Sequence, residues 1–206
     1  MSEKFRVVSL AGEATLPVVD GTIEWIPLRR RLGARAFGTN AYRAARAGDD
    51  VIEDHVESPG QEEMYVVVAG AARFTVGGER VDVGHADVLF LPDPDVRRAA
   101  VATADGTIVL GVGGWPGKPY HSLPWEPIFL AAEPMQQERW AEAAEILENE
   151  SGEHREHPRV RYRLAQCYAR LDQAERAAAE LRAALEAKPE LRDDAEGDEV
   201  LGPLLG

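Results

Sequence analysis

Apolar and polar residues alternate in short runs through the first half of the chain. Turn residues, mostly glycine, interrupt these runs about every 8 to 12 residues, which is typical of an all-β sandwich or barrel. The clearest hairpin is expected where Gly77 and Gly78 separate two alternating runs. Residues 1–34 are expected to add an edge strand, paired within the barrel or across a dimer. The runs predicted to be strands are RVVSL, TIEWIPL, AFGTNAYRAA, DVIEDHVE, EMYVVVA, ARFTV, ERVDV, DVLFLP, RRAAVA and GTIVLGV.

The alternation stops after the last of these runs. Residues 113–127, GGWPGKPYHSLPWEP, follow neither a strand nor a helix period, which predicts an extended connector. Its aromatic residues Trp115, Tyr120 and Trp125 are expected to lie against the barrel. From about Pro134 apolar residues recur at helical spacing. The predicted domains are a β-barrel over residues 1–115, a Pro- and Trp-rich linker over 116–132 and a helical tail over 133–206.

The helical tail contains an internal repeat. Ala143 and Leu147 recur as Ala177 and Leu181, 34 residues later, which is the tetratricopeptide period. One repeat read from residue 158 resembles the tetratricopeptide pattern at Leu164, Ala165, Tyr168, Ala177, Leu181, Ala184 and Pro189. The preceding repeat is expected to keep only its second helix, because PWEPIFLAA does not read as helical. One and a half repeats cannot bury their own faces, so the tail is expected to dock on the barrel or a second subunit, or to offer a groove to a partner peptide.

Composition narrows the classes of partner. A formal net charge of −13 disfavours nucleic acid, because that binding needs clustered Lys and Arg to neutralise phosphates. The one basic cluster, residues 28–32, is interpreted as a solvated loop or a contact to an acidic tail. No window approaches 18 apolar residues and the N-terminus lacks an export-signal pattern, so a cytoplasmic protein without a membrane span is expected. The single cysteine, Cys167, is expected to be a buried thiol in a helix, without a catalytic role.

The stretch GDDVIEDHVESPGQEEMYVVVAG resembles the first motif of the cupin superfamily. Gly48, His55, Glu63 and Gly70 occupy the places of its glycine, first histidine, glutamate and final glycine. The stretch GHADVLFLPDPDVRRAA resembles the second cupin motif less closely, through its first glycine and its first proline. The resemblance implies a cupin-type jelly-roll barrel. With the Trp-containing linker and the tetratricopeptide-like tail, the chain is similar to uncharacterised bacterial cupin-domain proteins.

Cupins that bind a metal generally supply three histidines and one glutamate from these motifs. Mapped onto this chain, the first histidine is His55, the second is replaced by Glu57, the glutamate is Glu63 and the last histidine is replaced by Arg97. His55 and Glu57 are two residues apart and share one face of a strand. The first of two open interpretations is that an arginine replaces the metal. The guanidinium of Arg97 would bridge the carboxylates, or, if the register slips by one, Arg98 would take that role.

The alternative is a divalent metal, Mn, Fe, Zn or Ni, held by His55, Glu57 and Glu63 with water. Three hypotheses of function follow. The first is a pocket for a small polar or anionic ligand, lined by His55, Glu57, Glu63, Tyr65 and Arg97, with the tail serving assembly. The second is a metal-dependent oxygenase or isomerase, and the third is a protein-interaction scaffold. A homodimer is expected in each case, and the sequence does not decide whether the protein is an enzyme.

Overall fold

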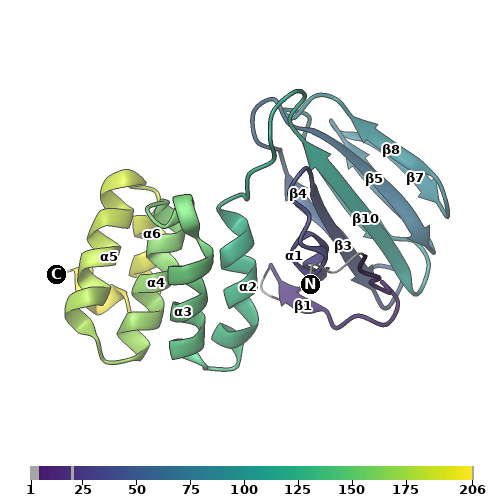
Figure 1. Cartoon of the computed structure of the whole chain (residues 1–206). Helices are drawn as coiled ribbons and strands as arrows, with labels where there is room; N and C mark the ends of the chain where they lie inside the picture. Colours follow the sequence, from purple (N-terminus) through teal and green to yellow (C-terminus); the bar gives the residue numbers. More distant parts are fainter. Residues whose placement is uncertain (1–4, 20, 206) are drawn as a thin grey trace. The chain divides into compact units, whose positions relative to one another are not determined.

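A computed structural model describes residues 5–19 and 21–205, and the chain divides into two compact units (Figure 1). The first unit spans residues 1–121 and contains the strands. The second unit spans residues 122–206 and is helical. The expected order of a β-domain followed by a helical tail is therefore observed.

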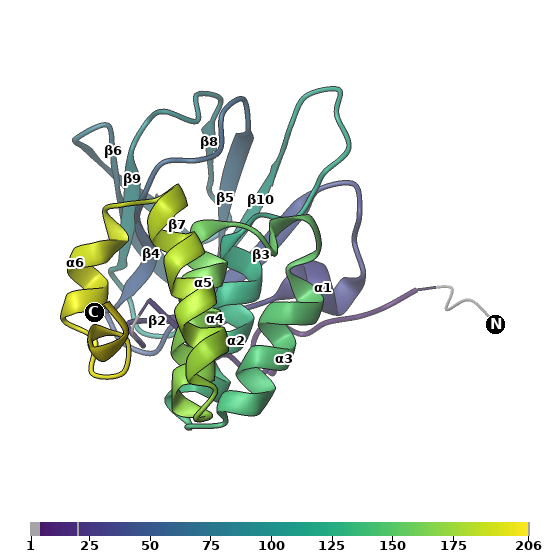
Figure 2. The same cartoon turned by 90° about the vertical axis from the view of Figure 1, so that its left-hand side faces the viewer.

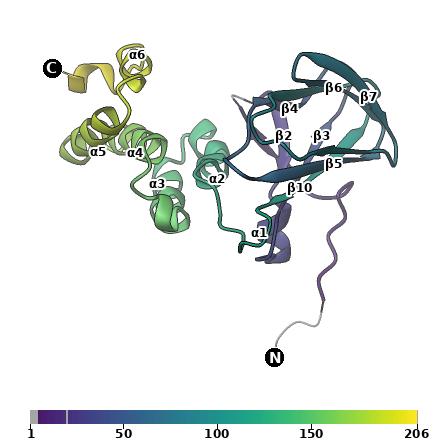
Figure 3. The same cartoon turned by 90° about the horizontal axis from the view of Figure 1, so that it is seen from above.

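The first unit is a sandwich of two antiparallel sheets, which face each other in the view from above (Figure 3). Such a double sheet is the architecture of jelly rolls, so the expected all-β fold is confirmed. One sheet has the order β1 (Leu16–Val18), β2 (Ile23–Ile26), β3 (Gly38–Ala44), β10 (Thr107–Gly114), β5 (Glu62–Ala69) and β8 (Val88–Leu91). The other has the order β4 (Asp50–His55), β9 (Arg98–Ala102), β6 (Ala71–Val76) and β7 (Glu79–Gly84).

Two predicted turn glycines and one motif glycine have clear physical roles. Gly77 and Gly78 join β6 to β7 with φ of 56° and 88°, the left-handed pair that a two-residue hairpin requires. Gly70 follows β5 with φ of 69°. A Cβ atom at Gly70 would collide with Oγ1 of Thr107. The hairpin prediction is confirmed, and the motif glycine is explained by strand packing.

The N-terminal region differs from the prediction in two places. β1 and β2 extend the six-stranded sheet through β3, so the expected edge pairing occurs within the sandwich. The run RVVSL at residues 6–10 is not a strand. The basic cluster is not a loop but a short helix, α1 (Leu28–Leu32). Within it, Arg31 forms an ion pair with Glu13, so the acidic partner comes from the N-terminal segment of the same unit.

The predicted connector is only partly extended. Trp115 donates from Nε1 to the backbone oxygen of Pro59, 3.1 Å away, and Tyr120 lies against Gly38, so both pack on the β-unit as expected. Trp125, however, begins a helix, α2 (Trp125–Gln136). Pro127 did not prevent this helix, because the first-turn N–H groups have no partner inside a helix. The prediction that PWEPIFLAA is not helical was therefore wrong.

The second unit contains two complete helix pairs and a short cap. After α2 come α3 (Trp140–Glu150), α4 (Pro158–Arg170), α5 (Ala174–Ala187) and α6 (Leu191–Glu196), with 3-10 turns at Gly152–His154 and Gly202–Leu205. Figure 2 shows α2, α3, α4 and α5 side by side. The upstream repeat thus has both helices, and not only the second as predicted. Cys167 is buried in α4, as expected.

Two apolar clusters hold the helical unit together. The first joins α2, α3, α4 and α5 through side chains that include Leu147, Leu164 and Ala177. The second joins α4 and α5 to the C-terminal residues Leu191 and Leu201, both nearly inaccessible to solvent. Six of the seven predicted repeat positions are therefore core positions, whereas Pro189 is exposed. Because the C-terminal segment covers the last helix pair, this unit buries more of its own surface than one and a half repeats would. Docking of the tail on another surface stays a prediction.

Candidate functional site

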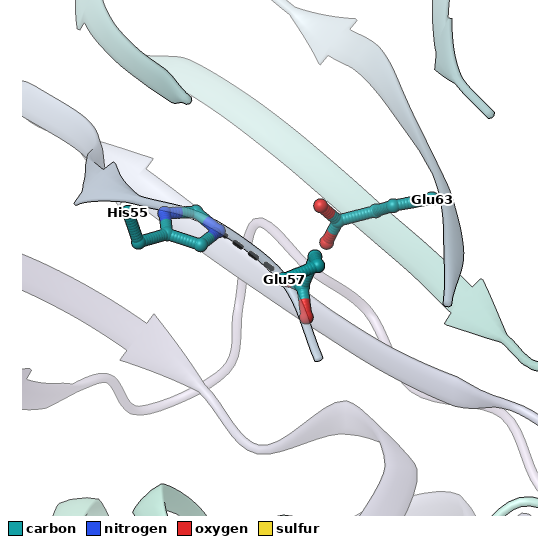
Figure 4. Close-up of side chains that lie close together, drawn as sticks. All are labelled: His55, Glu57 and Glu63. Atoms are coloured by element: carbon teal, nitrogen blue, oxygen red, sulfur yellow. Dashed lines mark ion pairs between the residues drawn. The ribbon is translucent and has the colours of Figure 1, made fainter. Parts of the chain in front are cut away.

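The candidate side chains come from both sheets and from the turn after β4, and they meet between the sheets (Figure 4). His55 is the last residue of β4, and Glu57 follows two residues later. Glu63 lies on β5 in the opposite sheet. One ligand atom from each of these three residues lies within 4.8 Å of the other two. The residues that the cupin-like motif placed together in sequence are therefore together in space.

Hydrogen bonds orient each member of this triad. Nδ1 of His55 lies 2.8 Å from the backbone oxygen of Glu53, and a carbonyl oxygen only accepts, so Nδ1 carries the proton. That leaves Nε2 of His55 facing Oε1 of Glu57 at 3.3 Å. The hydroxyl of Tyr65 donates to Oε2 of Glu63 at 2.6 Å. The backbone N–H of Glu57 donates to the oxygen of Pro94 at 3.0 Å, which fixes the turn after β4.

Burial and charge shift the pKa values of the triad. Burial raises the pKa of Glu63, and the charge of Glu57 adds to this, giving a value of about 8. For His55 burial alone would lower the pKa, but the hydrogen bond to Glu57 and the charge of Glu53 outweigh it and raise the pKa to about 9. Burial acts to raise the pKa of Glu57, yet the His55 partner brings it below its usual value. In the metal-free state the site therefore holds protons at neutral pH.

The arginine in the interior is Arg98, not Arg97. The side chain of Arg97 is 62% exposed and pairs with Oδ1 of Asp54 at 2.7 Å. The side chain of Arg98 is fully buried, and its Nε lies 3.9 Å from Oε2 of Glu63. Arg98 is the first residue of β9 and lies directly opposite His55 on β4, so both point to the same face. The expectation that Arg97 takes the place of the last metal ligand was wrong by one residue.

Several buried polar atoms at the site have no hydrogen-bond partner among the described residues. They are Nε and Nη2 of Arg98, Oε2 of Glu53 and Oε1 of Gln61. Glu53 and Gln61 were not identified from the sequence. Their spacing could have indicated them, because Glu53 precedes His55 by two residues and Gln61 precedes Glu63 by two. Unsatisfied buried atoms are rare in folded proteins and need an explanation.

The remaining candidate side chains lie outside this cluster. Glu62, the neighbour of Glu63 on β5, is exposed. His85 is exposed as well, and His121 stacks on Trp115 with ring centroids 4.2 Å apart. His157 caps α4 by accepting the backbone N–H of Arg159.

Comparisons with known proteins give two kinds of similarity. Residues 135–198 match the family model described as "Tetratricopeptide repeat". No curated protein matches the chain. Among solved structures, a cupin protein from Bacteroides fragilis is similar at 20% identity over 59% of this chain and 93% of its own, with a TM-score of 0.44. KdgF from Halomonas sp. is similar at 17% identity over 55% of this chain and 93% of its own, with a TM-score of 0.40. A sugar phosphate isomerase of the cupin superfamily from Silicibacter pomeroyi is similar at 21% identity over 49% of this chain and 66% of its own, with a TM-score of 0.39.

The chain combines a sandwich of two antiparallel sheets with a helical region that carries the tetratricopeptide signature. Both parts of the architecture expected from the sequence motifs are confirmed. His55, Glu57 and Glu63, expected from the sequence as alternative metal ligands, form a cluster that could hold a metal ion. None of the helices in the described part of the chain has the length and apolar character needed to cross a bilayer.

Proposed function

We propose that the β-unit binds a small polar or anionic molecule at a divalent metal centre formed by His55, Glu57 and Glu63. The observation that carries this proposal is the convergence of one imidazole and two carboxylates within 4.8 Å, from two different sheets. Such a mixed set suits Mn, Fe, Zn or Ni. Three protein ligands leave positions open for water or a small molecule.

The electrostatics of the cluster fit a cation. Glu63 is only 12% exposed and has no hydrogen bond from Arg98, whose Nε is 3.9 Å away. Its carboxyl keeps a proton up to a pKa of about 8 because of burial and the charge of Glu57. A divalent cation would replace that proton and offset both carboxylates. The carbonyl of Glu53 and the hydroxyl of Tyr65 already orient His55 and Glu63, which is the role of a second coordination shell.

A metal at this position would polarise a coordinated oxygen or lower the pKa of a bound water. The chain's own groups would then orient the bound molecule, and Glu63 and His55 would give up protons when the metal binds. A metal-dependent oxygenase or isomerase is the alternative proposal, and it uses the same three ligands. Simple binding of the small molecule requires the centre but no reaction.

The proposal predicts metal-dependent stability. Chelator-treated protein should gain thermal stability from at least one of Mn, Fe, Zn or Ni, because a ligand that binds only the folded state stabilises it by about 2.7 kcal/mol at 100 times its Kd. Protein purified without added metal should contain near-stoichiometric first-row metal by elemental analysis. A variant of the exposed His85, His85→Ala, should behave like the wild type. Metal-free protein that none of the four ions stabilises would exclude this centre.

For the helical unit we infer a role in assembly or in binding another protein. Support comes from the tetratricopeptide match over residues 135–198, since such repeats present extended surfaces to partners. Assembly would be that of a homodimer. Light scattering should then give the full chain about twice its 22.5 kDa mass, and a chain ending at residue 121 the mass of one copy. Equal association states for both chains would argue against assembly through the helices.

A further inference from the structure

One edge of the Arg98 guanidinium makes a hydrogen bond, and the other edge makes none. Nη1 donates to the backbone oxygen of Pro94 at 3.4 Å. Nε and Nη2, which form the opposite edge, have no hydrogen-bond partner in the described structure. The side chain is fully buried, so bulk solvent does not reach these donors. Arg98 therefore presents two parallel N–H groups to the interior of the sandwich.

Leaving such an edge unpaired is unfavourable. A buried N–H donor without an acceptor loses its hydration and gains no hydrogen bond in return. The nearest carboxylate of the chain does not fill the edge, because Glu63 lies 3.9 Å from Nε and its Oε2 accepts from Tyr65 instead. Among the described residues of the chain, Arg98 is also the only Lys or Arg in the fully buried class. An acceptor from outside the chain is therefore expected at this edge.

The free edge has a definite shape. Nε–H and one Nη2–H of an arginine point in the same direction and match the two oxygens of a carboxylate. Arg98 lies opposite His55 across the β4–β9 pair, where side chains are about 4.5 to 5.5 Å apart at Cβ. A small molecule held by Arg98 would thus have its next atoms beside the metal ligands. Oε2 of Glu53, a buried acceptor without a partner, would receive a hydrogen bond from a hydroxyl group.

We propose that the ligand of this site is a small hydroxy acid whose carboxylate is bound side-on by Nε and Nη2 of Arg98. Its hydroxyl group lies toward the metal centre and Glu53. This inference rests on the proposed function, since it places the acid next to a metal held by His55, Glu57 and Glu63. A carboxylate carries one negative charge and two coplanar acceptors, and both match a single guanidinium edge. Phosphate, which carries more charge, is an alternative occupant that the experiment below tests.

The experiment is a calorimetric titration of the metal-loaded full chain with four probes. Glycolate carries both groups, glycolamide replaces the carboxylate with a neutral amide, acetate lacks the hydroxyl, and phosphate is a tetrahedral anion. Glycolate should bind roughly 10- to 100-fold more tightly than glycolamide, because a charge-assisted pair of hydrogen bonds is lost with the carboxylate. It should also bind more tightly than acetate and phosphate. Equal binding of glycolate and glycolamide, or tighter binding of phosphate, would overturn the proposal.

Two variants separate the effect of the paired Nε and Nη2 donors of Arg98 from the effect of its positive charge. Arg98→Lys keeps a positive charge but loses the side-on pair, so the preference for glycolate over glycolamide should fall by about 10-fold. Arg97→Lys, on the exposed neighbour, should leave the preference unchanged. If Arg98→Lys does not fold, the comparison of probes on the wild type still decides the proposal. Metal content is measured in the same samples. Loaded protein that binds no glycolate overturns this inference alone, whereas protein that takes up no metal overturns the proposed centre.

Discussion

Replacing Glu63 by glutamine is expected to weaken metal binding roughly 100-fold or more while making the metal-free protein more stable at pH 8. The first effect follows from the loss of a charged ligand. The second follows from the pKa of Glu63, which burial and the charge of Glu57 raise from 4.5 to about 8. Between these two values the unfolded chain has lost the proton and the folded protein still holds it, so stability falls as pH rises.

The pH window of this effect is defined by the two pKa values. Below pH 4.5 wild type and Glu63→Gln should differ little, and above pH 8 the difference should be complete, on the order of 2 kcal/mol or more. Urea unfolding in the presence of a chelator at several pH values measures it. Glu62→Gln, on the exposed neighbour, serves as the matched control. A variant that is less stable than the wild type at pH 8 without metal would mean that Glu63 is not held protonated by its surroundings.

Above pH 8, where Glu63 has lost its proton, replacing Arg98 by methionine is expected to destabilise the metal-free protein by about 3–5 kcal/mol, because the buried carboxylates then lose the guanidinium that offsets them. The buried guanidinium is the cation nearest to Glu63, and it also helps to lower the pKa of Glu57. The same replacement of Arg97 should cost no more than about 1 kcal/mol, because its pair with Asp54 is mostly exposed. Chemical denaturation of both variants measures the difference.

The opposite order of stability of the two arginine variants would contradict the described register. If Arg97→Met is the more destabilised of the two, the register of β9 against β4 is shifted by one residue from the one described. A shift by one residue turns every side chain of a strand to the other face. Arg97 would then point inward, as the sequence suggested at first.

Much of the site could be predicted because its residues are close in sequence. His55 and Glu63 are separated by a short turn between two strands, and His55 and Glu57 are only two residues apart, so they meet although β4 ends at His55. Arg98 belongs to another strand, whose register against β4 depends on irregular pairing between Ile52 and His55. Sequence alternation does not reveal such a bulge, which is why the choice between Arg97 and Arg98 needed the structure.

The errors in the fold have similar physical causes. Residues 6–10 have the composition of a strand, but in the structure they pair with no strand. A strand needs a neighbour as well as a suitable sequence, and composition does not supply one. In α2 the prolines suggested a connector, yet Pro127 falls in the first turn, where a missing N–H has no cost. The packing of α2 against α3 and α4 then favours the helix.

The position of the triad across two sheets has a mechanical consequence. His55 belongs to the four-stranded sheet and Glu63 to the six-stranded sheet. A cation bound by both His55 and Glu63 would link the two sheets at the end where β4 stops and β5 begins. Separation of the two layers there and release of the ion would be a single event, so the rate at which this end of the sandwich opens would limit how fast the metal exchanges.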